Sequence, residues 1–360
     1  MFDHSHYVPI LKAKEGEFLG IKESANSTKD AMTPLFEIVN IPWDYVKDIE
    51  GKSLEGHLEN IPDKLLDCWG NERPLFIDSN QIDSDRSVGS GAHHLQHLFD
   101  GFRSKDLKTI PVTGFERHDF YKDAVRSIAM NDSRGICLRL NSKDLVDRSL
   151  ASKIDDFFRF YGLSIDQVDL LADYGSIYNS VPDLILASAQ SALTAIVPQI
   201  DSWRTLTFAA SSFPVNLGEI STNSIDRSLN RVEWAVWNDL ITRSLPRKPT
   251  FGDYSISNPT STEIDPRIMT ISANIRYTAD DFWLIMRGAS TKKYGYDQYH
   301  KLCSSLITQP EYCGASFSWG DQYIDSCSKK AVGTGNSTTW RKVGNNHHFK
   351  KVVDQIASLV

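Results

Sequence analysis

The sequence predicts an α/β protein built as one (β/α)8 barrel, similar to a TIM barrel, with a C-terminal extension over the rim. Short apolar runs recur eight times along the 360 residues, and such continuous apolar strands are typical of parallel sheets that are buried on both faces. Amphipathic stretches of helical length separate the runs. This alternation indicates right-handed βαβ units, and a barrel with insertions reaches this length as one domain.

The expected elements follow from these patterns. The eight barrel strands are expected at residues 34–39, 74–78, 109–113, 135–140, 168–173, 204–208, 250–254 and 274–277. The helices between them are expected at residues 93–102, 119–130, 146–161, 181–196 and 225–240, where apolar residues recur at spacings of three and four. Residues 7–12 are expected to form an extra N-terminal strand, or the first barrel strand if the count is off by one.

The pattern changes after Arg276. Two extended runs, 274–278 and 282–287, predict a hairpin or a bulged strand, and a helix follows at about 295–307. Residues 316–348 are rich in Gly, Ser and Asn, a composition typical of loops that cover a site, and a last helix is expected from about 349 to 359. We therefore expect residues 1–310 to form the barrel and residues 311–360 to be an extension packed on the same domain.

Composition excludes several classes of protein. A net charge of −7 gives no general attraction to nucleic acid or to anionic membranes. The five cysteines are scattered and none forms CxxC, which argues against a thiolate zinc site and fits a reducing cytosol. No apolar stretch approaches the roughly 18 residues of a membrane span, and the N-terminus lacks the pattern of a signal peptide. We expect a cytoplasmic protein with no membrane partner and no strong nucleic-acid signal.

Acidic side chains mark the ends of four expected strands. Glu37, Asp78, Asp173 and Asp253 each lie at or near the last residue of an apolar run. Active sites of (β/α)8 barrels are built where the strands end, so these four are the candidate catalytic residues. Together they would bind a divalent metal through oxygen ligands or act as a general acid and base. The alternative is a structural network of ion pairs with neighbouring basic residues.

Basic side chains lie near the same strand ends. Arg139 and Arg276 fall in expected strands, Arg287 ends the run 282–287, and Lys12 ends the run 7–12. A guanidinium group is a planar fork that suits carboxylate or phosphate. These residues are candidate ligand-binding groups for a phosphate-bearing or nucleotide-like small molecule, or for a phosphodiester bridged by a metal. Ion pairing with the acids explains them equally well.

The tail offers a further pair of polar residues. His347 and His348 are adjacent, and a loop or a helix start can direct one of them into a site. The alternative is that one caps the last helix and the other is solvated. No phosphate-binding glycine loop of the P-loop or dinucleotide type and no GxSxG nucleophile elbow occurs in the chain.

Several stretches together resemble the uncharacterised Beta protein family of phages, prophages and bacterial genomic islands. They lie at residues 7–12, 33–38, 110–114, 137–140, 251–254, 275–278, 287–288, 318–321, 340–341 and 346–348. The family's recurrent positions fall on the same charged strand ends and add Asp321 and Arg341 to the histidine pair. Because relatives tend to lie beside nuclease-like and immunity-type genes, the resemblance implies a role in anti-phage defence, with a nuclease or another defence protein as partner.

Two functions are therefore expected. In the first, the protein is a component of anti-phage defence or of a mobile element, and its barrel rim binds a ligand or a partner protein. In the second, it is a hydrolase or phosphodiesterase that uses the clustered rim carboxylates, with a divalent metal as the candidate cofactor. The tail is expected to pack over the rim, with Arg341, His347 or His348 reaching toward the strand-end acids.

Overall fold

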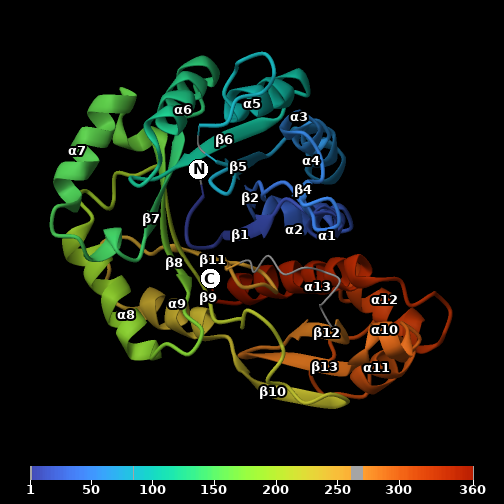
Figure 1. Ribbon diagram of the computed structural model, residues 1–360. Helices are drawn as coiled ribbons and strands as arrows, with labels where there is room; N and C mark the ends of the chain where they lie inside the picture. The colour runs from blue at the N-terminus through green and yellow to red at the C-terminus, as the bar shows by residue number, and fades with distance from the viewer. Residues whose placement is uncertain (1, 84, 261–270, 360) are drawn as a thin grey trace.

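Eight parallel strands close into a barrel in the computed structural model, which describes residues 2–83, 85–260 and 271–359. The strands neighbour one another in the order β1-β11-β9-β8-β7-β6-β5-β2, and every pairing is parallel. Their bounds are β1 Tyr7–Lys12, β2 Leu35–Glu37, β5 Pro74–Asp78, β6 Lys108–Thr113, β7 Ile136–Asn141, β8 Val168–Ser176, β9 Thr205–Ser211 and β11 Thr250–Asp253. The predicted fold class is confirmed (Figure 1).

Side chains alternate between the inside and the outside of the barrel, as successive residues of a strand must. Val8, Ile10 and Leu35 fill the interior as part of one apolar cluster. Tyr7 and Phe36, of opposite parity, belong to the larger cluster between the strands and the surrounding helices. This alternation decides which strand-end residues face the mouth of the barrel.

Helices between the strands form an outer ring (Figure 1). In α5, His94–Ser104, the residues Leu95, Leu98, Phe99 and Phe102 are all buried, as their spacing predicts. The remaining helices up to β11 are α1 Glu15–Lys22, α2 Asn26–Asp30, α3 Leu54–Leu58, α4 Ile61–Trp69, α6 Asp119–Asp132, α7 Leu150–Tyr161, α8 Pro182–Ser191 and α9 Val232–Thr242.

Of the two alternatives for residues 7–12, the first barrel strand is confirmed. The predictions for residues 274–277 and for a helix at 225–240 are wrong. Residues 274–277 belong to β12, Ser272–Thr278, which lies outside the barrel. There β12 pairs antiparallel with β13, Phe282–Ser290, because only three residues join them. The helix expected at 225–240 begins as β10, Ser224–Asn230, since this segment pairs with the free edge of β13 before α9 starts.

The Gly-, Ser- and Asn-rich region contains more helix than its composition predicts. It holds α12, Trp319–Ser328, and the first half of α13, Ser337–Ala357, which follow α10 Thr291–Tyr294 and α11 Gln298–Leu306. The polar residues cap the helices: the Ser318 hydroxyl accepts the N–H of Asp321, and the Asn336 side chain accepts the N–H of Thr339.

Helix α13 joins the barrel to the three-stranded sheet (Figure 1). In its first half, Trp340 and Val343 belong to the apolar core formed by the sheet with α11 and α12. In its second half, Phe349, Val352 and Ile356 belong to the main core around the barrel. The helix therefore packs beside α1 and completes the helical ring after the last barrel strand.

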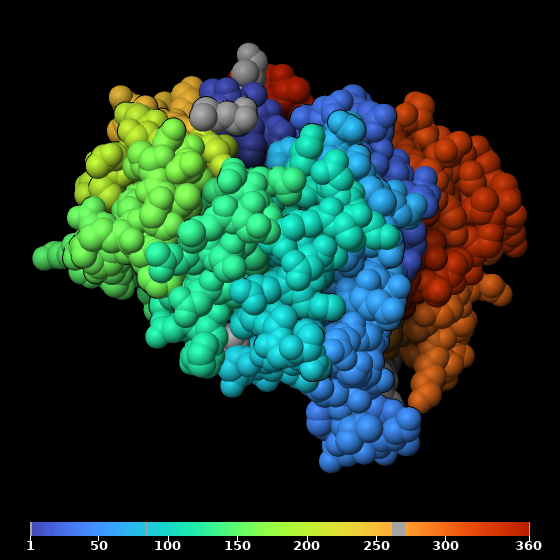
Figure 2. Space-filling model, turned by 90° about the horizontal axis from the view of Figure 1, so that it is seen from above, coloured from blue at the N-terminus to red at the C-terminus, as the bar shows by residue number. Residues whose placement is uncertain are grey.

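From above, the second unit of sheet and helices lies beside the barrel as one orange and red mass (Figure 2). A blue projection in the same view carries the short hairpin of β3, Trp43–Asp44, and β4, Ile49–Glu50. Within the described ranges, no helix is long and apolar enough to cross a membrane.

Candidate ligand-binding site

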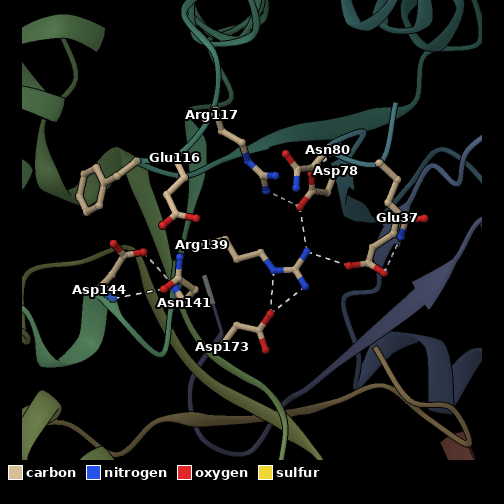
Figure 3. Close-up of a pocket in the computed structure, with 12 residues that line it drawn as sticks. Glu37, Asp78, Asn80, Glu116, Arg117, Arg139, Asn141, Asp144 and Asp173 are labelled. Carbon is tan, nitrogen blue, oxygen red and sulfur yellow. Dashed lines mark hydrogen bonds and ion pairs between the residues drawn. The ribbon is translucent and has the colours of Figure 1, made fainter. Parts of the chain in front are cut away.

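Four of the predicted site residues meet inside the mouth of the barrel (Figure 3). Each follows an inward-facing residue of its own strand by two positions, so its side chain also points inward. These residues are Glu37 on β2, Asp78 on β5, Arg139 on β7 and Asp173 on β8.

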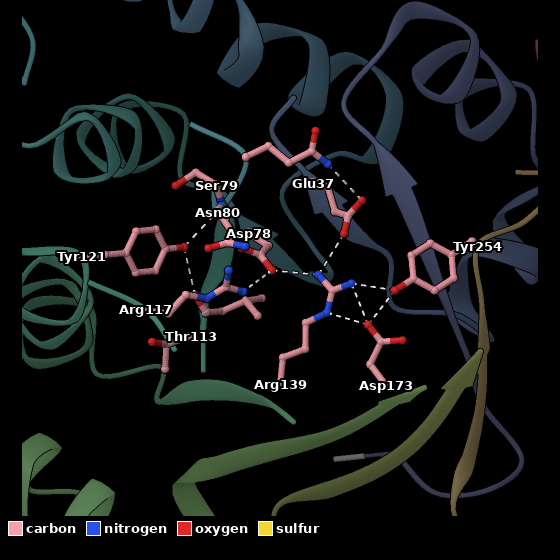
Figure 4. A network of polar contacts seen from close by, with 12 residues as sticks. Glu37, Asp78, Ser79, Asn80, Thr113, Arg117, Tyr121, Arg139, Asp173 and Tyr254 are labelled. Carbon is pink, nitrogen blue, oxygen red and sulfur yellow. Dashed lines mark hydrogen bonds and ion pairs between the residues drawn. The ribbon is translucent and has the colours of Figure 1, made fainter. Parts of the chain in front are cut away.

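Arg139 is the centre of this group (Figure 4). Its Nε donates to Asp173 Oδ2 at 2.8 Å, and its Nη1 donates to Glu37 Oε1 at 2.9 Å and to Asp78 Oδ2 at 2.8 Å. Its Nη2 donates to the Tyr254 hydroxyl at 2.7 Å and lies 2.7 Å from Asp173 Oδ2. Of the five N–H donors of a guanidinium group, four are in hydrogen bonds to these partners, and Nη2 is also ion-paired with Asp173.

Burial and ion pairing shift the pKa values of Glu37 and Asp78 in opposite directions. Burial raises the pKa of Glu37, and Arg139 offsets only part of that effect. Burial would also raise the pKa of Asp78, but Arg117 and Arg139 together bring it below its usual value. Two carboxyl groups on neighbouring strands therefore differ in their affinity for a proton.

A cavity of about 370 Å³ opens above this network. Its lining includes five carboxylates and two guanidinium groups, which are Glu37, Asp78, Glu116, Asp144, Asp173, Arg117 and Arg139. Because every nitrogen of Arg139 is already hydrogen-bonded within the protein, the cavity presents mainly acceptor oxygens and an excess of negative charge.

Arg117 is a site residue that the sequence analysis missed. Its Nη2 donates to Asp78 Oδ2 at 2.8 Å, and its side chain is only 10% exposed. Its Nε is buried and has no hydrogen-bond partner within the described ranges. The available signal was its position just after β6. The same signal marks Asn141 at the end of β7 and Asp144 just after it, because barrel sites use strand ends and the loops that follow them.

Asp253 does not join this group. It has the opposite parity on β11, so it points outward, whereas Tyr254 points into the interior cluster. The Tyr7 hydroxyl donates to Asp253 Oδ1 at 2.5 Å, and His348 Nε2 lies 2.9 Å from Oδ2. The strand-end rule used in the sequence analysis located Asp253 along the barrel but ignored which way it faces.

The two histidines are buried in α13. His348 contacts a strand-end acid, Asp253, as one alternative for the tail expected, but Asp253 faces away from the rim, so this contact does not place the tail over the rim. His347 instead contacts Asp321 of α12, with Nδ1 2.8 Å from Oδ2, and its Nε2 lies 2.9 Å from the carbonyl oxygen of Thr278. Neither histidine lines the rim cavity. The expected loop around them is a helix, which turns both side chains into the interior.

Arg276 and Arg341 lie together outside the barrel mouth. Arg276 Nη1 donates to the carbonyl oxygen of Ile256 at 2.7 Å, and Arg341 Nη1 donates to the same oxygen at 3.2 Å. Burial and the nearby charge of Arg341 lower the pKa of Arg276 well below its usual value. Arg276 is absent from the rim because its strand, β12, is not part of the barrel.

The last two predicted basic residues are also bound to main-chain oxygens. Arg287 on β13 donates to the carbonyls of Leu217 and Ile220. Lys12 ends β1 with inward parity, and its Nζ lies 3.4 Å from the carbonyl oxygen of Asn258. Burial lowers the pKa of Lys12, and the charge of Glu37 opposes that effect. Lys12 thus contributes positive charge at the edge of the rim network.

Within the described ranges, no group of three or more His, Cys, Asp or Glu side chains is placed to hold a metal ion.

The sequence and the fold were compared with those of known proteins. No curated protein matches the sequence. Among solved structures, the chain is similar to the YdjI aldolase from Escherichia coli K12, at 9% identity and a TM-score of 0.36, over 97% of this chain and 90% of that chain. The family model described as Beta protein matches residues 7–354. The chain therefore belongs to the Beta protein family.

Proposed function

We propose that the protein binds a small molecule rich in hydroxyl or ammonium groups at the barrel rim. The observation that carries this proposal is the excess of acceptors in the cavity, where five carboxylates face two guanidinium groups. Hydroxyl and ammonium groups donate hydrogen bonds to carboxylates, and a charged partner makes such bonds stronger.

A free phosphate group fits this cavity less well. Phosphate recognition relies on guanidinium forks with unoccupied donors, and every nitrogen of the Arg139 guanidinium group is already hydrogen-bonded within the protein. The surplus of carboxylates repels an added anion. The phosphate-bearing ligand expected from the arginines therefore ranks below a neutral or cationic one.

We propose that this binding serves a component of anti-phage defence or of a mobile element, acting in the cytoplasm with a nuclease or another defence protein. The support is the family membership together with the setting that the resemblance implies. Five free cysteines agree with a reducing compartment. Fold alone says nothing of this role.

Binding is tested by isothermal titration calorimetry with glucosamine, ribose, spermidine and inorganic phosphate. Glucosamine is expected to bind best because it offers both kinds of donor. Glu37→Gln should weaken glucosamine binding about tenfold, the loss expected for one charged hydrogen bond, while the exposed Glu59→Gln serves as the control. Phosphate binding more tightly than glucosamine, or equal affinity in both variants, would overturn the proposal.

The cellular role is tested by plating a panel of phages on cells that express the protein. Protection that is lost on Glu37→Gln and kept on Glu59→Gln would support a defence role that depends on the rim. Equal plaque numbers with and without the protein across the panel would count against it.

A second candidate, hydrolysis, is favoured by one observation. Glu37 has a raised pKa and Asp78 a lowered one, and carboxyl groups separated in this way can serve as acid and base. The test is release of p-nitrophenol from bis-p-nitrophenyl phosphate, with and without added Mg²⁺ or Mn²⁺. Turnover that is abolished by Glu37→Gln would support hydrolysis as the function. Absence of turnover under all these conditions would exclude phosphodiester hydrolysis as the function.

A further inference from the structure

A second cavity, of about 420 Å³, adjoins the rim cavity. Gly114, Phe115 and Glu116 line both cavities, so the loop after β6 is their common wall. At Gly114 this loop packs closely against the backbone of β7, because a Cβ there would stand 2.9 Å from the carbonyl oxygen of Arg139. A ligand that occupies both cavities must cross this loop.

The second cavity differs from the first in chemistry. It lies between α6 and α7 and is lined by the rings of Phe115, Phe157, Phe160 and Tyr161. The rings of Phe115 and Phe157 meet edge to face with centroids 6.5 Å apart, and Phe160 is half-buried. Aromatic side chains stack on flat rings with little dependence on the identity of the ring.

We propose that the two cavities together bind a nucleoside. The ribose hydroxyls donate to the carboxylates of the rim cavity, and the base packs against the aromatic side chains of the second cavity. The proposal rests on the proposed function and adds the class of ligand. One cavity is rich in hydrogen-bond acceptors and the other is aromatic. A nucleoside has two parts that match them, a sugar with hydroxyl donors and a flat base.

The same geometry favours a nucleoside over a nucleotide. A phosphate group beside Glu116 and the other rim carboxylates is repelled, and every nitrogen of Arg139 is already hydrogen-bonded within the protein. The two lysines at the second cavity, Lys122 and Lys153, lie 3.3 Å and 2.7 Å from Asp119 and Asp147. The lining of that cavity also holds three acidic residues, Glu116, Asp119 and Asp156, so acids outnumber lysines there.

The first experiment compares adenosine, ribose and AMP by isothermal titration calorimetry on the full chain. Adenosine is expected to bind at least tenfold more tightly than ribose, because the base adds stacking, and more tightly than AMP. If ribose and glucosamine bind as well as adenosine, the nucleoside proposal fails while the proposed function stands. If AMP binds more tightly than adenosine, the nucleoside proposal also fails. If no probe binds, both proposals fail.

The second experiment removes the stacking surface. Phe160→Ala should weaken adenosine about tenfold and leave ribose unchanged, whereas Phe120→Ala, an exposed residue of α6 outside the cavity, should change neither. Phe160→Leu keeps apolar volume without a ring and should weaken adenosine binding as much as Phe160→Ala. It provides the same test if the alanine variant does not fold. Unchanged adenosine binding in a folded Phe160 variant would overturn the proposal.

Discussion

His347 and Asp321 form a hydrogen-bonded pair that is shut off from solvent, with both side chains 0% exposed and His347 Nδ1 2.8 Å from Asp321 Oδ2. The other ring nitrogen lies 2.9 Å from the carbonyl oxygen of Thr278. Both ring nitrogens of His347 thus have an oxygen partner inside the protein. The pair joins α13 to α12 and to β12.

Breaking this pair should cost much of the protein's stability. Asp321→Asn removes the buried carboxylate that contacts His347, Ser318 and Tyr277, and it should lower the free energy of unfolding by about 3 kcal/mol at pH 7. Burial opposes ionisation of Asp321, but His347, Ser318 and Tyr277 together lower its pKa. A carboxyl with a lowered pKa stabilises the fold above its unfolded pKa of about 3.9, and the effect is lost as pH falls through the folded value.

Urea denaturation at pH 7 and at pH 3 measures this difference, which should shrink at the lower pH. The matched control is Asp325→Asn on the same helix, where the partner Lys329 is 65% exposed. That change should stay within about 0.5 kcal/mol. Equal losses from the two variants would show that the buried pair contributes no more than a surface pair.

Gly320 allows α12 and α13 to approach closely enough for this pair to form. A Cβ at Gly320 would overlap the carbonyl oxygen of Val343, so Gly320→Ala should cost about 1–3 kcal/mol through overpacking. Gly333→Ala, in the nearby loop, meets nothing within 4 Å and should change stability by less than about 0.5 kcal/mol. Thermal unfolding of the two variants checks this. A Tm for Gly320→Ala equal to that of Gly333→Ala would contradict the close packing.

Arg139 holds three buried carboxylates in place, so its loss should be severe. Arg139→Met leaves Glu37, Asp78 and Asp173 without their shared cation and should destabilise the fold by about 3–5 kcal/mol at pH 7. The variant should recover stability between pH 7 and pH 5, since protonation removes the uncompensated charge. The control is Arg159→Met, an exposed arginine of α7. Urea denaturation at the two pH values would refute the prediction if the Arg139 variant were equally unstable at both.

Glu37 should show the opposite pH dependence from Asp321. Its pKa is raised by burial, so its contribution to stability is fully present below its unfolded pKa of about 4.3 and is lost as pH rises through the folded value. Glu37→Gln should therefore match the natural protein at pH 4 and exceed it at pH 8. Thermal unfolding at both values tests this. A variant less stable than the natural protein at pH 8 would mean that the ion pair with Arg139 outweighs the cost of burial.

The barrel could be predicted because its strands and helices are marked by apolar patterns within short stretches of sequence. The apolar run 135–140 predicted the buried strand β7, Ile136–Asn141, and the spacing of apolar residues predicted the buried face of α5. Predicting the candidate site also required knowing which strand-end side chains point into the barrel. Glu37, Asp78, Arg139 and Asp173 were found from strand ends alone, while Asp253 was misplaced because its parity relative to the interior was not counted.

The rest depended on tertiary packing that the sequence does not display. Arg276 looked like a barrel residue until β12 proved to pair with β13. His347 and His348 were expected in a loop because the three residues before them, Gly344, Asn345 and Asn346, are poor helix formers. Burial of His347 against Asp321 and of His348 against Asp253 outweighs that intrinsic preference.

Asp253 and Tyr254 are successive residues that face opposite ways. One is bound to His348 of α13, and the other is bound to Arg139 at the rim. A single peptide unit thus connects the outer helix to the mouth of the barrel. A protein that binds α13 and shifts it would change the affinity at the rim, and by thermodynamic reciprocity a ligand at the rim would change the affinity for that protein by the same factor.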